Sequence, residues 1–183
     1  MYKRQLEIRS IASYDGIFVE DGSDREITDV AAAIICNVGD LPVEYAEIKL
    51  EGGELTFVVT ALDVESIAVV QELNGKNYKS CDWYECSADV AYMTAMEQSD
   101  GIVKISENED GTLSVSNISG EDIPCLRVFY KFYMIDQNAY VGGITYNFKI
   151  LDLKAGQSQT VTPSHYIPDY SKIVMIKTYD EEN

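Results

Sequence analysis

The chain of 183 residues contains an internal repeat, and this repeat constrains its fold more than any other feature. The segment IICNVGDLPVEYAEIKL (34–50) aligns with VSNISGEDIPCLRVFYKF (115–132) after a gap of two residues, with Asn37 opposite Asn117. Further along, both copies have a Gly-Gly pair followed by Leu or Ile, then Thr and an aromatic residue. Because a repeated sequence unit forms a repeated structural unit, we expect two homologous domains.

The two domains are predicted to cover residues 6–98 and 99–183. Each opens with a segment in which apolar and polar residues alternate, such as LEIRSI (6–11), the pattern of a half-buried strand. CLRVFYKFYMI (125–135) is rich in aromatic and β-branched residues, which favour strands. Clusters of Gly, Asn and Asp separate these segments, and strands do not alternate with helices. The pattern therefore predicts an all-β protein with two tandem antiparallel β-sandwich domains.

Two segments of the first domain are harder to assign. LDVESIAVVQEL (62–73) has the propensity of a short helix, but its counterpart LKAGQSQTVTP (153–163) does not, so we interpret both as strands. Residues 74–88 have no counterpart of matching composition, and we expect a longer loop there.

The chain is strongly acidic, with 31 Asp and Glu residues against 14 Lys and Arg residues and a net charge of -17. Binding to a nucleic-acid backbone needs clustered basic residues, so this composition argues against a nucleic-acid partner and against an anionic membrane surface. A hydrophobic content of 46% is that of a globular protein. No apolar stretch reaches the roughly 18 residues that a membrane-spanning helix needs.

The second domain resembles the FxLYD-type domain family of Gram-positive surface proteins and lipoproteins. Phe132-Tyr133-Met134-Ile135-Asp136 stands where that family has Phe-x-Leu-Tyr-Asp, and it differs at two of the five positions. Asn117-Ile118-Ser119 is similar to the Asn-x-Ser turn of the family, and residues 153–158 to its Leu-x-x-Gly-x-Ser segment. The resemblance covers about 113–162. It implies an immunoglobulin-like β-sandwich and an extracytoplasmic setting, and it supplies no catalytic residues.

No catalytic residues are predicted. His165 is the only histidine, and its segment TPSHYIPDY suggests a surface loop beside aromatic residues. Catalytic sequence motifs of hydrolases, metalloproteases and nucleotide-binding enzymes are absent. The sequence favours a protein that is not an enzyme and that has no cofactor.

Four cysteines leave two possibilities open. Cys81 and Cys86 flank the segment CDWYEC, where a disulfide in a small loop is sterically possible and would indicate an oxidising compartment. Cys36 and Cys125 lie in predicted strands of different domains, where we expect buried free thiols. The spacing of cysteines does not match a zinc site.

Two other segments are candidate ligand sites. Trp83 and Tyr84 lie in the same cysteine-containing loop and could stack on a sugar ring or a protein, although packing of Trp83 onto the sandwich is the alternative. Glu20, Asp21 and the other acidic residues of segment 20–29 offer oxygen ligands to calcium, but their spacing is not that of an EF-hand, so no metal site is predicted.

The first five residues, MYKRQ, are interpreted as a translated sequencing adapter, with an ordinary basic N-terminus as the alternative. A signal peptide or anchor would then lie upstream of Leu6. Together these observations favour a spacer or interaction module of a larger bacterial cell-surface or secreted protein, with an unknown protein or glycan partner. The alternative is a carbohydrate-binding accessory module that uses loop aromatics.

Overall fold

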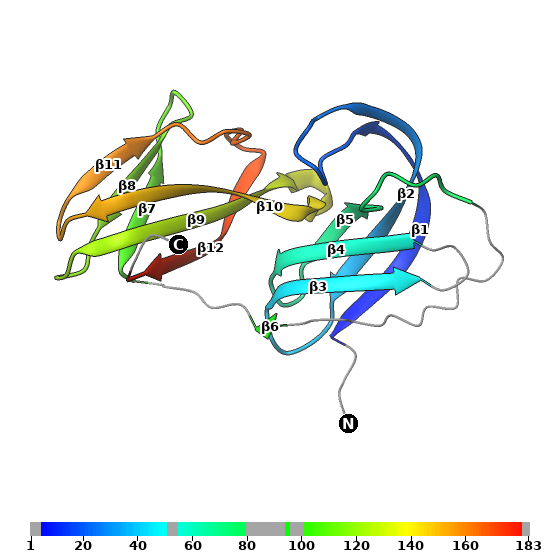
Figure 1. Ribbon diagram of the computed structural model, residues 1–183, viewed down its shortest axis with the longest axis horizontal. Coiled ribbons are helices and arrows are strands. Elements are labelled where there is room, and N and C mark those ends of the chain that lie inside the picture. The colour runs from blue at the N-terminus through cyan, green and yellow to red at the C-terminus, as the bar shows by residue number, and fades with distance from the viewer. Residues whose placement is uncertain (1–4, 51–54, 80–93, 96–100, 181–183) are drawn as a thin grey trace. The chain divides into compact units, whose positions relative to one another are not determined.

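A computed structural model describes residues 5–50, 55–79, 94–95 and 101–180 (Figure 1). The protein is all-β, as predicted, and the described residues contain no α-helix. The strands are β1 Leu6–Ile17, β2 Glu26–Asn37, β3 Val43–Leu50, β4 Leu55–Leu62, β5 Ile67–Gln71, β6 Thr94–Ala95, β7 Val103–Glu107, β8 Leu113–Asn117, β9 Ile123–Met134, β10 Ala139–Leu153, β11 Ser158–Val161 and β12 Ser171–Tyr179, with a short 3₁₀ helix at Ile135–Gln137.

The chain divides into two compact units. Unit 1 comprises residues 1–96 and 133–145, and unit 2 comprises residues 97–132 and 146–183. The β9–β10 tip, residues 133–145, therefore belongs to unit 1, whereas the rest of these two long strands belongs to unit 2. The sequence places the whole of both strands in the second domain, so the division by contacts differs from the predicted one at this tip.

In unit 1, β1, β2 and β5 follow one another in one sheet, and β4, β3 and β6 form another. β4 packs against β2 and β5. The side chains between the sheets are small or aliphatic, and they include Ala33, Ile35, Ile48, Val59 and Val70, each at most 1% exposed. Within the segment 62–73, Ile67–Gln71 forms β5, Leu62 ends β4 and no residue is helical, as the repeat counterpart indicated.

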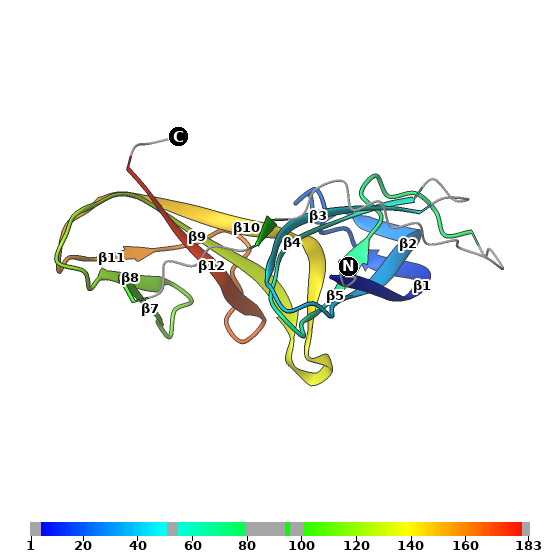
Figure 2. The ribbon, with the colours of Figure 1, turned by 90° about the horizontal axis from the view of Figure 1, so that it is seen from below.

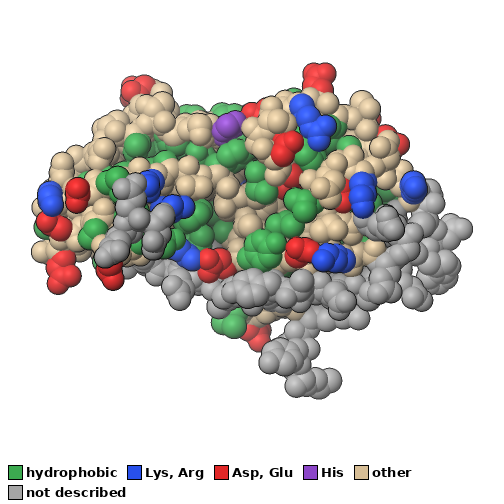
Figure 3. Space-filling model, in the orientation of Figure 1, with side chains coloured by type: hydrophobic (Ala, Val, Ile, Leu, Met, Phe, Trp, Pro, Cys, Tyr) green, Lys and Arg blue, Asp and Glu red, His purple; other side chains and the backbone are tan. Residues whose placement is uncertain are grey.

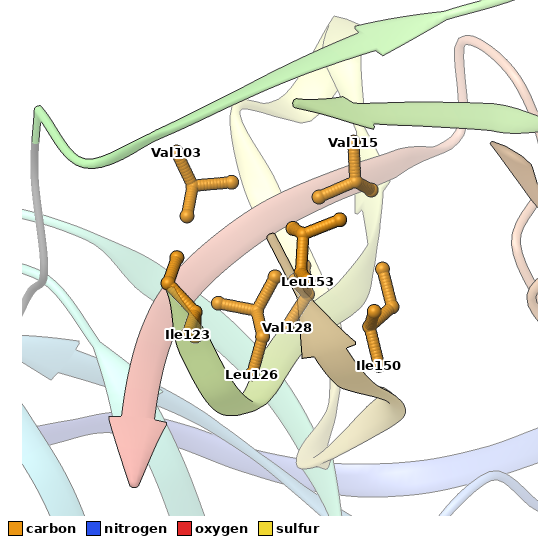
Figure 4. Close-up of a cluster of buried hydrophobic side chains, with 7 residues drawn as sticks. All are labelled: Val103, Val115, Ile123, Leu126, Val128, Ile150 and Leu153. Atoms are coloured by element: carbon orange, nitrogen blue, oxygen red, sulfur yellow. The ribbon is translucent and has the colours of Figure 1, made fainter. Parts of the chain in front are cut away.

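In unit 2, β7, β8 and β11 form one sheet, and β9 lies between β10 and β12 in the other. Figure 2 shows these two sheets of unit 2 as separate layers. Val103 and Val115 project from the first sheet toward Leu126, Val128 and Ile150 on the second (Figure 4). Burial of these branched aliphatic side chains holds the layers together.

In the described parts of the chain the strand pairing is mostly antiparallel, and one pairing is parallel. The beginning of β10, within the β9–β10 tip, runs parallel to β5, with Tyr140 beside Ala68 and Val141 beside Val69. The prediction of purely antiparallel sheets is therefore wrong at this position. A strand that joins a sheet from a distant part of the chain takes its direction from that segment's own hairpin, which a local sequence pattern does not reveal.

Candidate functional site

The residues predicted to contact a ligand or to form a disulfide lie outside the described parts of the chain. These are Trp83, Tyr84, Cys81 and Cys86. The loop that carries them stays a prediction from the sequence alone. The described residues contain buried polar side chains and an aromatic cluster, which are held in place by the strands around them.

The two remaining cysteines are buried free thiols, as predicted. Cys36 on β2 is 2% exposed, and Cys125 on β9 is 1% exposed. Burial raises the pKa of the Cys36 thiol, so this group stays protonated and unreactive at neutral pH.

An asparagine at the end of β2 organises one end of unit 1. Asn37 is 1% exposed, and its amide nitrogen donates hydrogen bonds to the backbone oxygens of Leu41 (2.8 Å) and Leu62 (3.0 Å). Its side-chain oxygen accepts a bond from the backbone nitrogen of Gly39 (3.1 Å). One side chain thereby satisfies three backbone groups of the turn and of β4.

Asn117, at the end of β8, makes the equivalent bonds in unit 2. Its amide nitrogen donates to the backbone oxygens of Glu121 (2.8 Å) and Leu153 (3.1 Å), and its side-chain oxygen accepts from the backbone nitrogen of Ser119 (2.9 Å). Asn117 is also 1% exposed. The two residues that the sequence alignment pairs therefore occupy the same place in two separate hydrogen-bond networks.

Gln5 takes part in the unit 1 network. Its backbone oxygen accepts a bond from the nitrogen of Val38 (2.9 Å), and its side chain donates to Asn37 (2.9 Å). In unit 2, the oxygen of Ile102 accepts the corresponding bond from Ile118 (2.9 Å). Gln5 thus occupies a repeat position, although it is the last residue of the segment interpreted as adapter.

The β9–β10 tip is attached to the rest of unit 1 by the buried carboxylate of Glu20. Glu20 is 6% exposed, and it accepts hydrogen bonds from the backbone nitrogens of Gly143 (2.9 and 3.0 Å) and Ile144 (3.3 Å). It also accepts one from the nitrogen of Gln71 on β5 (2.9 Å). The carboxylate therefore joins the tip to β5, which is the strand beside it in the sheet.

The fit at this position depends on glycine. A Cβ atom on Gly143 would lie 1.6 Å from the backbone oxygen of Val58, and one on Gly142 would lie 2.5 Å from the side chain of Val19. Thr60 on β4 also donates a hydrogen bond to the backbone oxygen of Gly143 (2.8 Å). The Gly-Gly pair thus allows the backbone of the tip to lie directly against β4.

Two further buried polar side chains complete this region of unit 1. Gln71 accepts a bond from the nitrogen of Val19 (2.9 Å) and donates one to the oxygen of Ile17 (2.8 Å). Glu72, fully buried, accepts bonds from three backbone nitrogens, those of Thr56 (3.2 Å), Asn74 (2.8 Å) and Lys76 (2.9 Å). Buried carboxylates that are surrounded by backbone amides hold loops in place and are not free to bind a ligand.

The acidic segment 20–29 is dispersed in the structure. Glu20 faces inward to the tip, whereas Asp21 accepts a bond from the nitrogen of Ser23 (2.9 Å) and pairs with Arg25 (3.6 Å). Asp29 accepts a bond from the hydroxyl of Ser13 (2.8 Å). Within the described ranges, no group of three or more His, Cys, Asp or Glu residues is placed to hold a metal ion.

His165 lies in the loop between β11 and β12 and packs against aromatic residues of unit 2. Its ring stacks on Tyr146 with a centroid distance of 4.6 Å and an angle of 14°. Tyr146 in turn stacks on Tyr130 (6.0 Å) and contacts the edge of Phe132 (5.3 Å). The first residue of the FxLYD-like motif is thus part of an aromatic cluster in which His165 packs by its ring face.

Burial also affects two tyrosine hydroxyls. It raises the pKa of Tyr140, in the β9–β10 tip, to about 12, with smaller contributions from Tyr133 and Asp63. In unit 2, burial and the hydrogen bond that Tyr166 donates to Glu107 (2.8 Å) raise the pKa of Tyr166. Both hydroxyls stay neutral over the physiological range.

The surface of unit 2 has a shallow hollow of about 540 Å³ beside the Asn117 turn. Its lining is Ile102, the segment 119–124 and the segment 178–180. Asp122, in this lining, accepts bonds from the nitrogen of Ala155 (3.0 Å) and from Lys154 (3.1 Å), and these bonds hold its pKa below the usual value. The lining of the hollow therefore consists of backbone groups and of the Asp122 carboxylate, which already accepts hydrogen bonds from Lys154 and Ala155.

The chain matches no family model, no curated protein and no solved structure. In the parts of the chain that the structure covers, no helix is long and apolar enough to span a membrane.

Sequence reasoning found the two asparagine turns but missed the role of Glu20 and of the Gly-Gly pair. Glu20 was expected only as part of the acidic segment 20–29, and the pair Gly142-Gly143 only as part of the repeat. A signal was present, since Glu20 follows the apolar pair Phe18-Val19 and so continues a buried segment.

Proposed function

We propose that the chain is a non-enzymatic spacer or interaction module of a larger bacterial cell-surface or secreted protein, made of two tandem immunoglobulin-like β-sandwiches. One observation carries the proposal. Units 1 and 2 have the same strand order, with the first, second and fifth strands in one sheet and the fourth, third and sixth in the other. Two facing sheets with the third and last strands adjacent belong to the class of architecture that includes immunoglobulin-like domains.

The FxLYD resemblance adds support to the same proposal. Asn117 and Ser119 form the turn that the resemblance implies, and Ser119 donates a hydrogen bond from its hydroxyl to Asn117 (2.6 Å). Phe132 and Tyr133 lie near the end of β9, which ends at Met134 just before the hairpin. Buried asparagine turns, a buried carboxylate and close glycine contacts stabilise a scaffold and do not provide reacting groups, which suits a module with a mechanical or docking role.

Recovery of the intact gene tests whether the module is exported to the cell surface or secreted. Sequencing across its 5′ junction in the source DNA should show an export signal, a lipobox or a membrane anchor upstream of Leu6. Antibody against this chain should then label intact cells of the source organism. A genuine start at Met1 with no upstream coding sequence, or labelling only after the cells are opened, would refute the surface role.

The carbohydrate-binding alternative depends on Trp83 and Tyr84, which lie outside the described residues. Titration with soluble cell-wall and plant glycans, followed by tryptophan fluorescence, separates it from the proposal. The proposal expects no change in fluorescence, because Trp83 is the only tryptophan and would report any sugar bound beside it.

A further inference from the structure

β2 and β5 of unit 1 are apolar on both of their faces. β2 contains the run VAAAIIC (30–36), and β5 contains the run IAVV (67–70). A strand that exposes one face to water alternates apolar and polar residues, whereas a continuous apolar run is typical of a strand that is covered on both faces. Packing on β4 covers one face of β2 and β5. It therefore explains only half of their apolar side chains.

The strand register places a row of β-branched side chains across the outer face. Ile35 and Val70 point into the core of unit 1. Their neighbours Ile34 and Val69 therefore point outward. Ile34 is the partner of Val69 in the pairing of β2 with β5, and Val69 is the partner of Val141 in the pairing of β5 with β10. The three outward side chains are adjacent across three strands.

One further pair of residues lies on the same side, two positions along the strands. Ile67 on β5 is the partner of Cys36 on β2. Cys36 is buried, whereas Ile34 is 36% exposed. The accessible residues form what we call the apolar face, namely Ile34, Ile67, Val69 and Val141, of which the last three are half-buried.

Unit 2 has hydroxyl residues at the positions equivalent to those on β2 and β5. The equivalence follows from the alignment of Asn37 with Asn117 and from the pairing of β11 with β8, which matches that of β5 with β2. The residues at these positions are Ser114 and Ser116 on β8 and Ser158 and Thr160 on β11. The repeated fold therefore does not require an apolar outer face, and a contact made only by unit 1 explains it.

The apolar face has no net charge, although the chain is strongly acidic. β5 and the segment 139–145 contain no Asp, Glu, Lys or Arg. Glu7 and Arg9 on β1 are exposed, and Glu7 is the partner of Cys36, so it lies on the same side. Burial raises the pKa of the Cys36 thiol, Arg9 lowers it and Glu7 raises it, so both charges lie near this thiol. No hydrogen bond or ion pair to another described residue engages Glu7 or Arg9.

The opposite side of unit 1 is different. Figure 1 draws β3 and β4 in front of β1 and β2, and Figure 3 shows charged side chains of both signs over this side of the unit. Glu47 and Lys49 on β3 form an ion pair there (2.6 Å). Charged side chains that pair within one chain are compatible with water, so only the side formed by β2, β5 and the tip lacks a cover.

From these observations we infer that the apolar face of unit 1 is the contact surface between two copies of this chain. A two-fold axis brings the same side chains of each copy together. Sheets pack face to face through their side chains at a separation of about 10 Å, so the two apolar faces exclude water from each other. The proposal rests on the proposed interaction role and names the surface and the partner.

Charge identifies a second copy as the partner. A face that carries one anion, Glu7, and one cation, Arg9, has no net charge and complements an identical face. A strongly acidic or basic partner would find no net charge of opposite sign on it. The apolar centre supplies the attraction, because burial of apolar area is the main driving force of protein association. Two copies of the acidic chain thus meet where their own charge does not oppose the contact.

Analytical ultracentrifugation of the full chain tests the proposal. The mean mass should rise from that of one chain toward that of two as the concentration is raised. The variant Ile34→Thr/Val69→Thr introduces hydroxyl side chains, as in unit 2, and keeps the β-branched shape. It should dimerise at least about tenfold more weakly, because both copies lose apolar area at the centre of the contact.

The matched control is Ile118→Thr/Leu151→Thr, which removes the same kind of side chain from unit 2. Ile118 is 56% exposed and Leu151 is 43% exposed, and both lie outside the apolar face. Single exposed apolar residues of this kind are ordinary on protein surfaces. The control should therefore dimerise within about twofold of the parent chain.

Arg9→Glu tests the charge of the face and leaves its apolar centre unchanged. Each copy then has two acidic residues at the same place, so the dimer should weaken about tenfold through like-charge repulsion. The double reversal Glu7→Arg/Arg9→Glu makes the face neutral again on both copies and should regain most of the lost affinity. Both positions are exposed, so we expect these variants to remain folded, which circular dichroism checks.

Three results would overturn the proposal. They are a chain that remains monomeric up to about 1 mM, equal weakening of the dimer by the unit 1 and unit 2 double variants, and no recovery with the double charge reversal. The intact gene tests the cell-surface role separately, so a chain that stays monomeric leaves that role standing.

Discussion

Units 1 and 2 share a strand order and an asparagine-centred turn, yet only unit 1 receives an additional strand. In unit 1 the fifth strand, β5, pairs with β2 on one side and with the β9–β10 tip on the other. The equivalent strand of unit 2, β11, pairs with β8 and ends its sheet. The same strand arrangement therefore has a neighbour on both sides of its fifth strand in unit 1. In unit 2 the fifth strand is the last strand of its sheet.

The side chains of β5 and β11 differ in the same way as their surroundings. β5 reads IAVVQ, and Ala68 and Val70 are fully buried. β11 reads SQTV and is largely exposed. Polar side chains on a short edge strand discourage further pairing, whereas apolar ones suit a strand that is covered on both sides.

The tip, and not the repeat, accounts for the buried carboxylate of Glu20 in unit 1. Glu20 occurs in the longer connection between β1 and β2, where unit 2 has only a tight turn at Asn108–Thr112. Its carboxylate binds backbone amides of the tip, and no Asp or Glu is buried among the described residues of unit 2.

Gly143→Ala should cause the largest loss of stability. The added Cβ would lie 1.6 Å from the backbone oxygen of Val58, which cannot move without shifting β4. We expect the free energy of unfolding of unit 1 to fall by about 4 kcal/mol or more. Hydrogen exchange should show lost protection in β4 and β5. Gly120→Ala, whose Cβ meets nothing within 4 Å, is the matched control and should change stability little.

Glu20→Ala should destabilise the same region without a steric clash. The backbone nitrogens of Gln71, Gly143 and Ile144 would lose their acceptor, at a cost of about 3 kcal/mol. Urea unfolding measures the loss, and exchange of the tip amides locates it. Glu26→Ala, at an exposed position, serves as control. Equal effects of the two substitutions would contradict a specific role for Glu20.

Asn37→Ala and Asn117→Ala should have similar effects, one in each unit. Each removes two donated and two accepted hydrogen bonds from a buried turn, so we expect about 2 kcal/mol for each. Hydrogen exchange resolved by segment should assign each loss to its own unit. A loss confined to one of the two variants would show that the networks differ in energy despite their shared geometry.

Alkaline pH should weaken the attachment of the tip through Tyr140. Burial raises its pKa in the folded protein from 10 to about 12, so the unfolded chain ionises first as pH rises. The contribution to stability is complete below pH 10 and decreases toward pH 12. Between pH 9 and 11 the loss should be about 1 kcal/mol. Comparing urea unfolding of the parent with that of Tyr140→Phe at both values isolates this contribution, which the variant should lack.

Much of the local structure could be predicted from the sequence because it depends on residues close together along the chain. Alternating side chains predicted a strand at LEIRSI (6–11), and the structure confirms it as the beginning of β1. The repeat identified Asn37 and Asn117 as turn residues, and their side chains do bond to nearby backbone groups. The strand at 62–73 was recovered because its counterpart in the repeat excluded a helix.

The sequence by itself determined the strand content, the turns and the buried thiols, since period and composition reflect burial on the two faces of a strand. Only the tertiary structure decided which unit the β9–β10 tip belongs to and in which direction it pairs. It also decided that Glu20 is buried. These outcomes depend on contacts between residues more than 20 positions apart, which a local pattern does not encode.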